Sequence, residues 1–461
     1  MGIAVAAFLI IRLIYQFLQS EYESSSLDEF LVVCLGLLAP FGIRGLARSP
    51  QGLRFLICSV AYGAVILLSS YMHSYSFERG GDVFYRGLLL DLKFLMLFFG
   101  AYALALNSVR KGGSERAIGL ILQVLILVAL VDSIQVLRDV LGNGIDFDGD
   151  RLGVRGPFYR PEGFFHHPVP SAQVALFGFL ASLTRLVKRF TPVRLGLAIY
   201  IFLMLILHVS VKEIIVGCFA LMLFVLLFVR SNALTKVVAA LIGLAAVGSI
   251  FASAAGSQIS ERISFYTGEE GGDSVRRILY SASVDIANDM MPIGSGTSTF
   301  GSQGSRTDGY SSLYFTYGVY GRWGASKEND TYLLDTFWPK ILAETGYAGL
   351  FFFVMTVMVL LGAGFRTMMA TRTPEDAFLF AAMFGILIIS SAAAALADEL
   401  TGPLFYVFGA FALARARHLL PLIRRRRKAR RQDMRLHGDR GQQRGRIIAA
   451  VGRGFSRKDF A

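Results

Sequence analysis

Long runs of apolar residues, separated by short polar connections, dominate the chain as far as residue 417. A helix needs roughly 20 mostly apolar residues to cross the hydrocarbon core of a bilayer. About twelve segments approach that length, and the first, second and seventh of them are short or interrupted. We therefore predict an all-α, polytopic membrane protein. Its expected spans are 2–18, 29–46, 53–72, 87–108, 117–136, 171–187, 194–209, 213–230, 236–254, 346–365, 376–396 and 399–417.

Charged residues give these spans a direction. Every second connection is basic, whereas the connections between them are acidic or neutral, such as QSEYESSSLDE at 19–29 and ADEL at 397–400. Basic connections remain in the cytoplasm, so an even number of spans places both termini there. The basic connections contain Arg44, Arg48 and Arg54; Arg110, Lys111 and Arg116; Lys188, Arg189 and Arg194; and Arg366 and Arg372.

The C-terminal tail supplies the overall charge. The chain has 461 residues, of which 54% are hydrophobic and 17% charged, and its formal net charge is +13. From Ala414 onward there are 16 Lys or Arg and 3 Asp or Glu, a net of +13, so the rest of the chain is balanced. A basic segment directly after a span binds anionic lipid and fixes topology. We interpret RRRRKARR at 424–431 in this way and expect membrane lipids, not nucleic acid, as its partner.

Two long connections lie on the side opposite the basic loops, and the larger one has helical patterning. DSVRRILYSASVDIAND at 273–289 carries apolar residues at helical spacing, and DTYLLDTFWPKILAETG at 330–346 predicts a second helix in which Pro339 makes a kink or a break. We expect this loop to form a small, mostly helical cap. The predicted divisions are N-terminal spans at 1–136, a first outer loop at 137–170, central spans at 171–254, a large outer loop or cap at 255–345, C-terminal spans at 346–417 and a basic cytoplasmic tail at 418–461.

The stretch RPEGFFHHPVPSAQVALFGFL at 160–180 begins as a polar loop and ends as a span. Its prolines stiffen the backbone, and Gly163 permits an unusual turn. A solvated loop with a surface salt bridge is one interpretation. A metal site is disfavoured, because adjacent histidine side chains diverge and no third ligand lies nearby. The ionisable residues in and just before this stretch are Arg155, Arg160, Glu162, His166 and His167.

Further ionisable residues are expected at the same face of the membrane. Such groups at membrane depth are costly and usually face a cavity. Asp91 with Lys93, and Lys212 with Glu213, are each compatible with a structural ion pair. Several cations at one face would also bind a membrane-bound diphosphate, because Arg matches phosphate oxygens in bidentate geometry and Lys supplies a point charge. The cations are Lys93, Lys212, Arg276 and Arg277.

The Gly/Ser-rich stretch PIGSGTSTFG at 292–301 does not fit a nucleotide site. It lacks the G-x-x-x-x-G-K-[ST] pattern of a P-loop, and no strand–helix unit surrounds it. We expect a flexible turn with exposed amides, and no cofactor.

Four stretches together resemble the bacterial O-antigen ligase/polymerase superfamily of membrane glycosyltransferases. RPEGFFHHPVPSAQVA at 160–175 is similar to its Arg-x-x-Gly…Pro segment, and SVKEI at 210–214 occupies its outer Ser-Arg turn. PIGSGTSTF at 292–300 is similar to its Pro-x-x-Gly-x-Gly-x-x-x-Phe turn, and NDTYLLDTFWPKILAETGYAGLFFF at 329–353 to its Asn/Asp…Leu…Glu-x-Gly-x-x-Gly segment. The resemblance covers roughly 85–400 and keeps the family's order and large outer loop.

The resemblance implies a fold of the GT-C-like kind in the bacterial inner membrane, with the reaction at the periplasmic face. The donor would be a polyprenyl-diphosphate-linked glycan, the acceptor a hydroxyl group, and neither nucleotide sugar nor metal would be needed. Arg160, Lys212 and Lys93 would neutralise the diphosphate leaving group, and a base would take the acceptor proton. Four residues remain open as that base: Asp330, Glu344, Glu162 and His167.

Two departures from the family pattern favour a polymerase over a ligase. Family ligases carry a histidine in the last outer segment, where this chain has Asp330 or Asp335 instead and no histidine between His208 and His418. Lys212 also replaces the usual arginine. Glycan transfer to lipid A core or protein remains an alternative, as does a transporter or flippase, although a transporter places its charges near the bilayer midplane. The polymerase interpretation leaves open a partner protein that regulates chain length.

Overall fold

The computed structural model describes residues 10, 27–78, 80–143, 154–155, 158–159, 161–165, 167–208, 210–229, 275–306, 310–321, 337–391, 393–398, 400–423 and 425. This part of the chain is almost entirely helical, as predicted. Its strands are β1 (Val154–Arg155) and β2 (Phe158–Tyr159), which form a short antiparallel pair.

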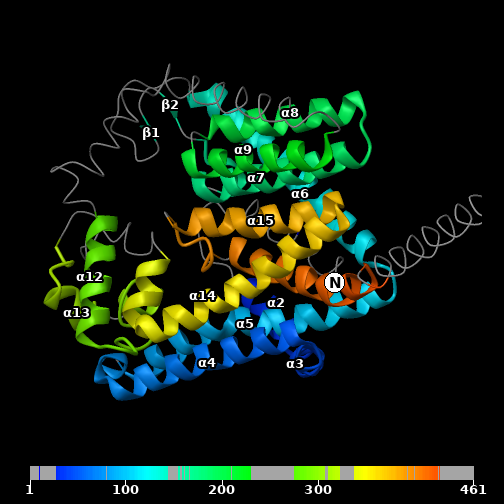
Figure 1. Ribbon diagram of the computed structural model, residues 1–461. Helices are drawn as coiled ribbons and strands as arrows, with labels where there is room; N and C mark the ends of the chain where they lie inside the picture. Colours follow the sequence, from blue (N-terminus) through cyan, green and yellow to red (C-terminus); the bar gives the residue numbers. More distant parts are fainter. Residues whose placement is uncertain are drawn as a thin grey trace, which may run out of the picture.

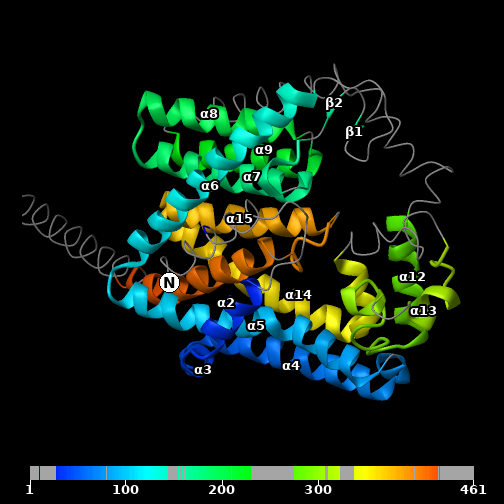
Figure 2. The ribbon, with the colours of Figure 1, turned by 180° about the vertical axis from the view of Figure 1, so that it is seen from behind.

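The long helices form two groups with further helices between them (Figure 1). The view from behind shows the same arrangement (Figure 2). One group comprises α2 (Leu27–Gly36), α3 (Ala39–Ala47), α4 (Pro50–Met72) and α5 (Gly81–Arg110), with the 3₁₀ turn η1 (Ser74–Phe77). The other comprises α6 (Ser114–Asn143), α7 (Pro168–Lys188), α8 (Pro192–Leu207) and α9 (Val211–Phe228). Between them lie α14 (Trp338–Thr371), α15 (Pro374–Ser390) and a helix over 401–423.

The helix over 401–423 joins the two groups. Its residues 401–416 are all buried, which is typical of a helix that is apolar on every side and surrounded by other helices. Tyr406 stacks on Phe94 of α5, with ring centroids 5.7 Å apart. The ring centroid of Phe408 lies 5.3 Å from that of Phe378 of α15 and 6.4 Å from that of Phe177 of α7. This helix therefore forms the centre of the apolar core.

Six of the described helices are long and apolar enough to cross a membrane, so the chain is a multi-pass membrane protein. They are α4, α5, α6, α7, α9 and α14. The apolar helix α8 is shorter, with 16 residues. The expected span at 29–46 is interrupted, because α2 ends at Gly36 and α3 begins at Ala39. The expected spans at 2–18 and 236–254 lie essentially outside the described residues, and a total of twelve stays a prediction.

Four helices begin with the same combination of a side-chain N-cap and a proline in the first turn. Proline stands in the first turn of each, where its missing N–H and fixed φ suit a helix start. The side chain of the preceding residue accepts a hydrogen bond from a first-turn amide, as N-capping requires. The capping residues are Ser49 before α4, His167 before α7, Thr191 before α8 and Thr373 before α15.

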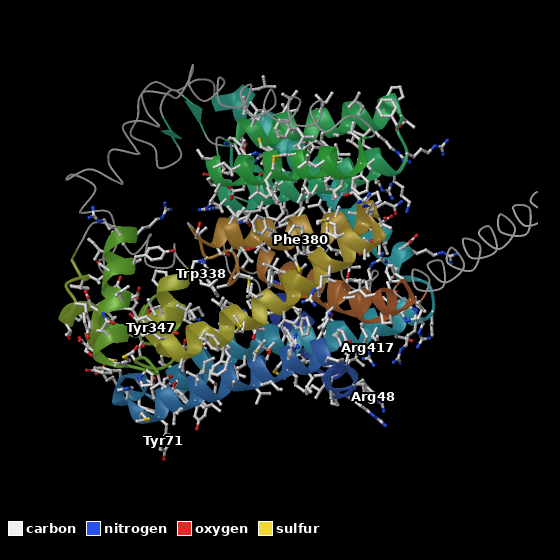
Figure 3. All side chains as sticks on the ribbon, in the orientation of Figure 1. Arg48, Tyr71, Trp338, Tyr347, Phe380 and Arg417 are labelled. Carbon is white, nitrogen blue, oxygen red and sulfur yellow. The ribbon has the colours of Figure 1, made fainter. Side chains whose placement is uncertain are left out.

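A small helical unit lies at one end of the bundle (Figure 1). This α12–α13 unit (275–321) contains α12 (Val275–Asp289), the 3₁₀ turn η4 (Gln303–Arg306) and α13 (Ser312–Thr316). The predicted helix at 273–289 is therefore confirmed. Tyr71 and Tyr347 lie near this end of the bundle, whereas Arg48 and Arg417 lie at the other (Figure 3).

The end opposite the α12–α13 unit is closed by ion pairs, one of them buried and another formed by the exposed Lys188. The Arg415 guanidinium binds Asp376 of α15 in bidentate geometry, with Nε–Oδ1 and Nη2–Oδ2 distances of 2.6 and 2.9 Å. Its Nη1 also donates to Ser114 Oγ at 3.0 Å, so one side chain connects three helices. Lys188 Nζ contacts Glu375 Oε1 at 2.5 Å.

We expect Arg415→Gln to destabilise the bundle strongly. Removing one partner of a buried ion pair leaves an uncompensated charge, here Asp376, at a cost of about 3–5 kcal/mol. Thermal unfolding of the purified protein in detergent measures the effect. Arg366→Gln is the matched control, because Arg366 is exposed and bonds only a carbonyl of its own helix. Equal midpoints for the two variants would contradict the expected role of Arg415.

Candidate functional site

The α12–α13 unit has a small core of its own and is tied to the helix ends beneath it. Its apolar residues surround Tyr314, and burial raises the pKa of Tyr314 to about 12, so the phenol stays protonated. Tyr280 donates to the carbonyl of Ser391 at 3.0 Å, and Tyr347 of α14 donates to Asn288 at 2.8 Å. These bonds fix α12 against the bundle.

The stretch at 292–302, called the Gly/Ser loop below, is buried from Ile293 onward rather than exposed. The expectation of a flexible turn with exposed amides is therefore wrong: Ser295, Thr297 and Phe300 are each at most 1% exposed. Three backbone bonds join the loop to α14: Ser295 N to Ala343 O and Gly296 N to Glu344 O, both 2.9 Å, and Ala348 N to Pro292 O, 3.0 Å. These backbone hydrogen bonds thus hold the loop against α14.

Gly346 makes this contact possible. It interrupts α14 with φ 62° and ψ −168°, a conformation that favours glycine. Because the helix is interrupted here, the carbonyls of Ala343 and Glu344 are released from helical hydrogen bonding. They accept hydrogen bonds from the loop amides instead. A Cβ at Gly346 would lie 2.5 Å from Gly294 N and from Pro292 O. Pro339 lies in the first turn of α14, and the part of the predicted helix before it, 330–336, lies outside the described residues, so the kink or break predicted there stays a prediction.

The Glu344 carboxylate anchors the loop from inside. Its Oε1 accepts hydrogen bonds from Thr299 N at 2.9 Å, Phe300 N at 3.2 Å and Ser302 Oγ at 2.7 Å. Glu344 is 1% exposed. A catalytic base must be able to reach an acceptor hydroxyl, and a buried carboxylate with three donors is instead typical of a structural anchor. Glu344 therefore ranks below the other candidates for the base.

Asp91 of α5 is the second anchor of the Gly/Ser loop. It forms an ion pair with Lys340 of α14 and accepts a hydrogen bond from Thr297 Oγ1 at 2.5 Å. Asp91 is thus paired with Lys340 of α14, a residue far from it in the sequence. Lys93, two residues further on, places its ammonium group 5.0 Å from the ring centroid of Phe94.

Two aspartates of α6 hold the loop that follows Arg160. Asp139 Oδ2 accepts from the amides of Glu162 at 3.2 Å and Gly163 at 3.0 Å. Asp132 Oδ1 accepts from Phe164 N at 2.8 Å. Gly163 has φ 64°, which confirms the unusual turn predicted there, and a Cβ on it would lie 2.5 Å from Ser171 Oγ.

A buried chain of hydrogen bonds continues from Asp132 to the next turn. Ser171 of α7 donates to Asp132 and contacts His208 Nε2 at 2.7 Å. His208 Nδ1 lies 2.8 Å from Met204 O, and it donates there because a carbonyl only accepts. The three residues are not a catalytic triad, since serine stands between the acid and the histidine and all are buried. They connect the loop at 161–165 to the end of α8.

Lys212 and Glu213 follow that connection by a few residues. Both lie in the first turn of α9, and Lys212 Nζ is 4.0 Å from Glu213 Oε1, as the ion-pair interpretation predicted. Glu213 is buried and accepts a hydrogen bond from Ser210. The side chain of Lys212 is 20% exposed.

The other predicted residues are placed as follows. His167 is exposed and caps α7, with its Nδ1 accepting from Val169 N at 3.2 Å. Arg276 and Arg277 lie in the first turn of α12, and Arg155 lies on β1. Arg160, His166, Asp330 and Asp335 are outside the described residues. In the described part of the chain, no group of three His, Cys, Asp or Glu residues could hold a metal ion.

Asp132, Asp139 and Lys340 were not singled out from the sequence. The signal for Asp132 was present, because it is a charged residue inside an otherwise apolar predicted span. No such signal marked Lys340, which lies in a mixed polar and aromatic stretch.

No protein-family model and no curated protein sequence matches this chain. A function for it therefore has to be argued from its own residues and from the resemblance of its motifs.

We expect Gly346→Ala to displace the Gly/Ser loop and to destabilise the protein by about 1–3 kcal/mol, because the new Cβ overlaps loop backbone. Gly119→Ala is the control, since Gly119 lies in α6 with no atom within 4 Å of a new Cβ. Thermal unfolding in detergent and limited proteolysis check both variants. Unchanged stability and unchanged cleavage within 292–302 in Gly346→Ala would show that the contact with α14 is dispensable.

Proposed function

We propose that the chain is an inverting, metal-independent membrane glycosyltransferase. It polymerises polyprenyl-diphosphate-linked oligosaccharide units of an O-antigen or exopolysaccharide at the periplasmic face of the bacterial inner membrane. The four family-like stretches carry the resemblance, and their contacts support it. PIGSGTSTF and ETGYAG form one hydrogen-bonded unit through Glu344 and the backbone bonds at Gly346.

A single observation carries the assignment of the site. The loop at 161–165 and the turn at 208–212 are joined by the buried chain Asp132–Ser171–His208. Arg160 directly precedes this loop in the sequence, and Lys212 is the last residue of this turn, within the first turn of α9. The loop that follows Arg160 and the helix start that carries Lys212 are some 50 residues apart in sequence, and they share one support, as a diphosphate clamp requires.

The chemistry follows from these roles. The acceptor hydroxyl attacks the anomeric carbon on the face opposite the diphosphate, so the new glycosidic bond forms as the bond to the diphosphate oxygen breaks. Arg160 and Lys212 neutralise the charge that develops on the leaving group. A base takes the hydroxyl proton. The candidates for the base are Asp330, Glu162 and His167, with Glu344 ranked last because it is buried and already accepts three hydrogen bonds.

The proposal predicts a ladder of products. Purified full-length protein in lipid, supplied only with a lipid-linked oligosaccharide, should yield glycans that differ by one unit on a gel. An unchanged donor would remove the polymerase assignment. Products formed only after addition of lipid A core or an acceptor protein would identify a ligase. Transbilayer movement of an unchanged donor would identify a transporter.

We expect Arg160→Ala and Lys212→Ala each to abolish the ladder while the amount of protein in the membrane stays constant. Arg160→Lys should restore part of the activity, because the charge returns without bidentate geometry. Arg110→Ala and Lys111→Ala are matched controls, since both residues are exposed at the other end of the bundle. Normal ladders from both Arg160→Ala and Lys212→Ala would refute the clamp.

A further inference from the structure

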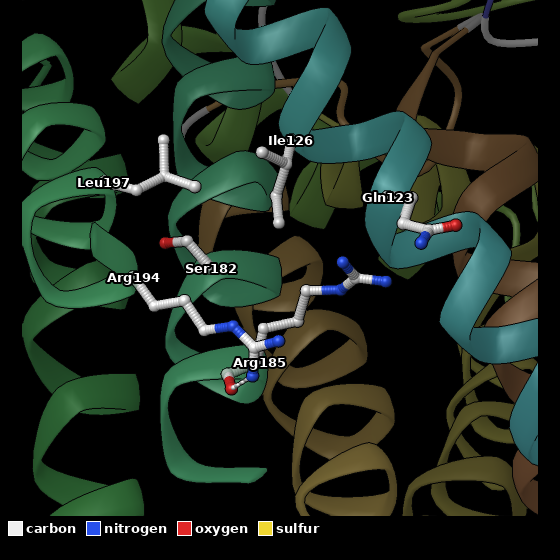
Figure 4. A pocket seen from close by; sticks show the side chains of 6 residues that line it. All are labelled: Gln123, Ile126, Ser182, Arg185, Arg194 and Leu197. Atoms are coloured by element: carbon white, nitrogen blue, oxygen red, sulfur yellow. Dashed lines mark hydrogen bonds between the residues drawn. The ribbon is translucent and has the colours of Figure 1, made fainter. Parts of the chain in front are cut away.

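A cavity of about 200 Å³ lies between α6, α7 and α8, near the end of the bundle that carries the basic connections (Figure 4). This volume is more than ten times the about 10–15 Å³ that one water requires. Each helix contributes two lining residues. They are Gln123 and Ile126 of α6, Ser182 and Arg185 of α7, and Arg194 and Leu197 of α8.

Two guanidinium groups reach this cavity. Arg185 Nη2 donates to the carbonyl of Gly119 at 3.4 Å, and Arg194 Nη1 donates to the carbonyls of Arg185 at 3.1 Å and Arg189 at 3.0 Å. Figure 4 shows the Arg185 guanidinium extending toward Gln123 and that of Arg194 lying beside the Arg185 backbone. Each guanidinium has five N–H donors, so these bonds leave donors available to a ligand.

The nearby acids do not neutralise these two arginines. Glu375 pairs with Lys188, and Asp376 pairs with Arg415. Within the described residues, neither Arg185 nor Arg194 has a carboxylate within 4.0 Å. Two like charges that line one partly buried cavity repel each other, and an anion between them removes that repulsion.

We propose that this cavity binds the phosphate headgroup of an anionic phospholipid from the leaflet at this end of the bundle. Arg185 stands in the last turn of α7 and Arg194 in the first turn of α8, where helix ends meet the headgroup region. Arginine binds phosphate oxygens in bidentate geometry. Basic pockets between membrane helices on the cytoplasmic side are a known mode of headgroup binding.

The apolar part of the lining favours a lipid over a soluble phosphate compound. Ile126 and Leu197 line the cavity beside the arginines, and the outer surface of α8 exposes Leu195 and Ile199. An acyl chain can lie along that surface while its phosphate occupies the cavity. The site is independent of the proposed transfer reaction, whose residues belong to the other end of the helices.

The test compares phosphatidylglycerol, phosphatidylcholine and inorganic phosphate on the purified full-length protein by native mass spectrometry. The cavity variant is Arg185→Gln with Arg194→Gln. The control is Arg110→Gln with Arg116→Gln, which removes two exposed positive charges at the same end. We expect the wild-type protein to retain phosphatidylglycerol in preference to phosphatidylcholine. The cavity variant should bind it about tenfold or more weakly, as the loss of one charge-assisted hydrogen bond already predicts.

Three results would overturn the proposal. One is equal retention of phosphatidylglycerol by the cavity and control variants. Another is equal retention of the two lipids by the wild-type protein. The third is displacement of the lipid by an equal concentration of inorganic phosphate, which would assign the cavity to a soluble phosphate compound. If the double variant does not fold, Arg185→Gln and Arg194→Gln are measured singly, and unchanged affinity in both refutes the site.

Discussion

Carboxylates buried among apolar helices need hydrogen-bond donors, and in this chain backbone amides supply many of them. The buried Asp132 and Glu344 and the partly buried Asp139 together accept hydrogen bonds from five loop amides. An isolated charge in such surroundings is strongly unfavourable, so each carboxylate and its loop stabilise each other. Loops that would otherwise move above the bundle are thereby held in one conformation. The rest of the proposed site depends on this constraint, because its cations stand next to the anchored segments.

The two ends of the bundle use their acids differently. At the end with the basic connections, Asp376 and Glu375 bind the side chains of Arg415 and Lys188 and close the helix ends together. At the end with the α12–α13 unit, Asp91 and Glu213 pair with Lys340 and Lys212, whereas Asp132, Asp139 and Glu344 accept hydrogen bonds from loop amides. Side-chain ion pairs thus join the helix ends at one face, whereas carboxylate–amide hydrogen bonds hold the loops at the other.

Much of the fold was readable from hydrophobic runs, because a span must be long, apolar and helical. Helix α12 was readable for a related reason, since its buried residues recur at helical spacing. The burial of the Gly/Ser loop was not readable. Its glycines and serines resemble those of any exposed turn, and what buries it is a distant glutamate together with a glycine that interrupts α14. Contacts of that kind join residues more than 40 positions apart and leave no local pattern.

The site was predictable only as a set of candidate charges. Sequence placed Glu162 and His167 together, and the ion-pair interpretation of Lys212 and Glu213 matches their 4.0 Å separation. It could not separate a residue that anchors a loop from one that performs chemistry, because both are polar residues beside a span. Glu344 shows the difference: the same carboxylate that family resemblance offers as a base already accepts three donors. Burial and three accepted hydrogen bonds thus identify Glu344 as an anchor of the Gly/Ser loop, and the assignment of the base among the four candidates stays a prediction.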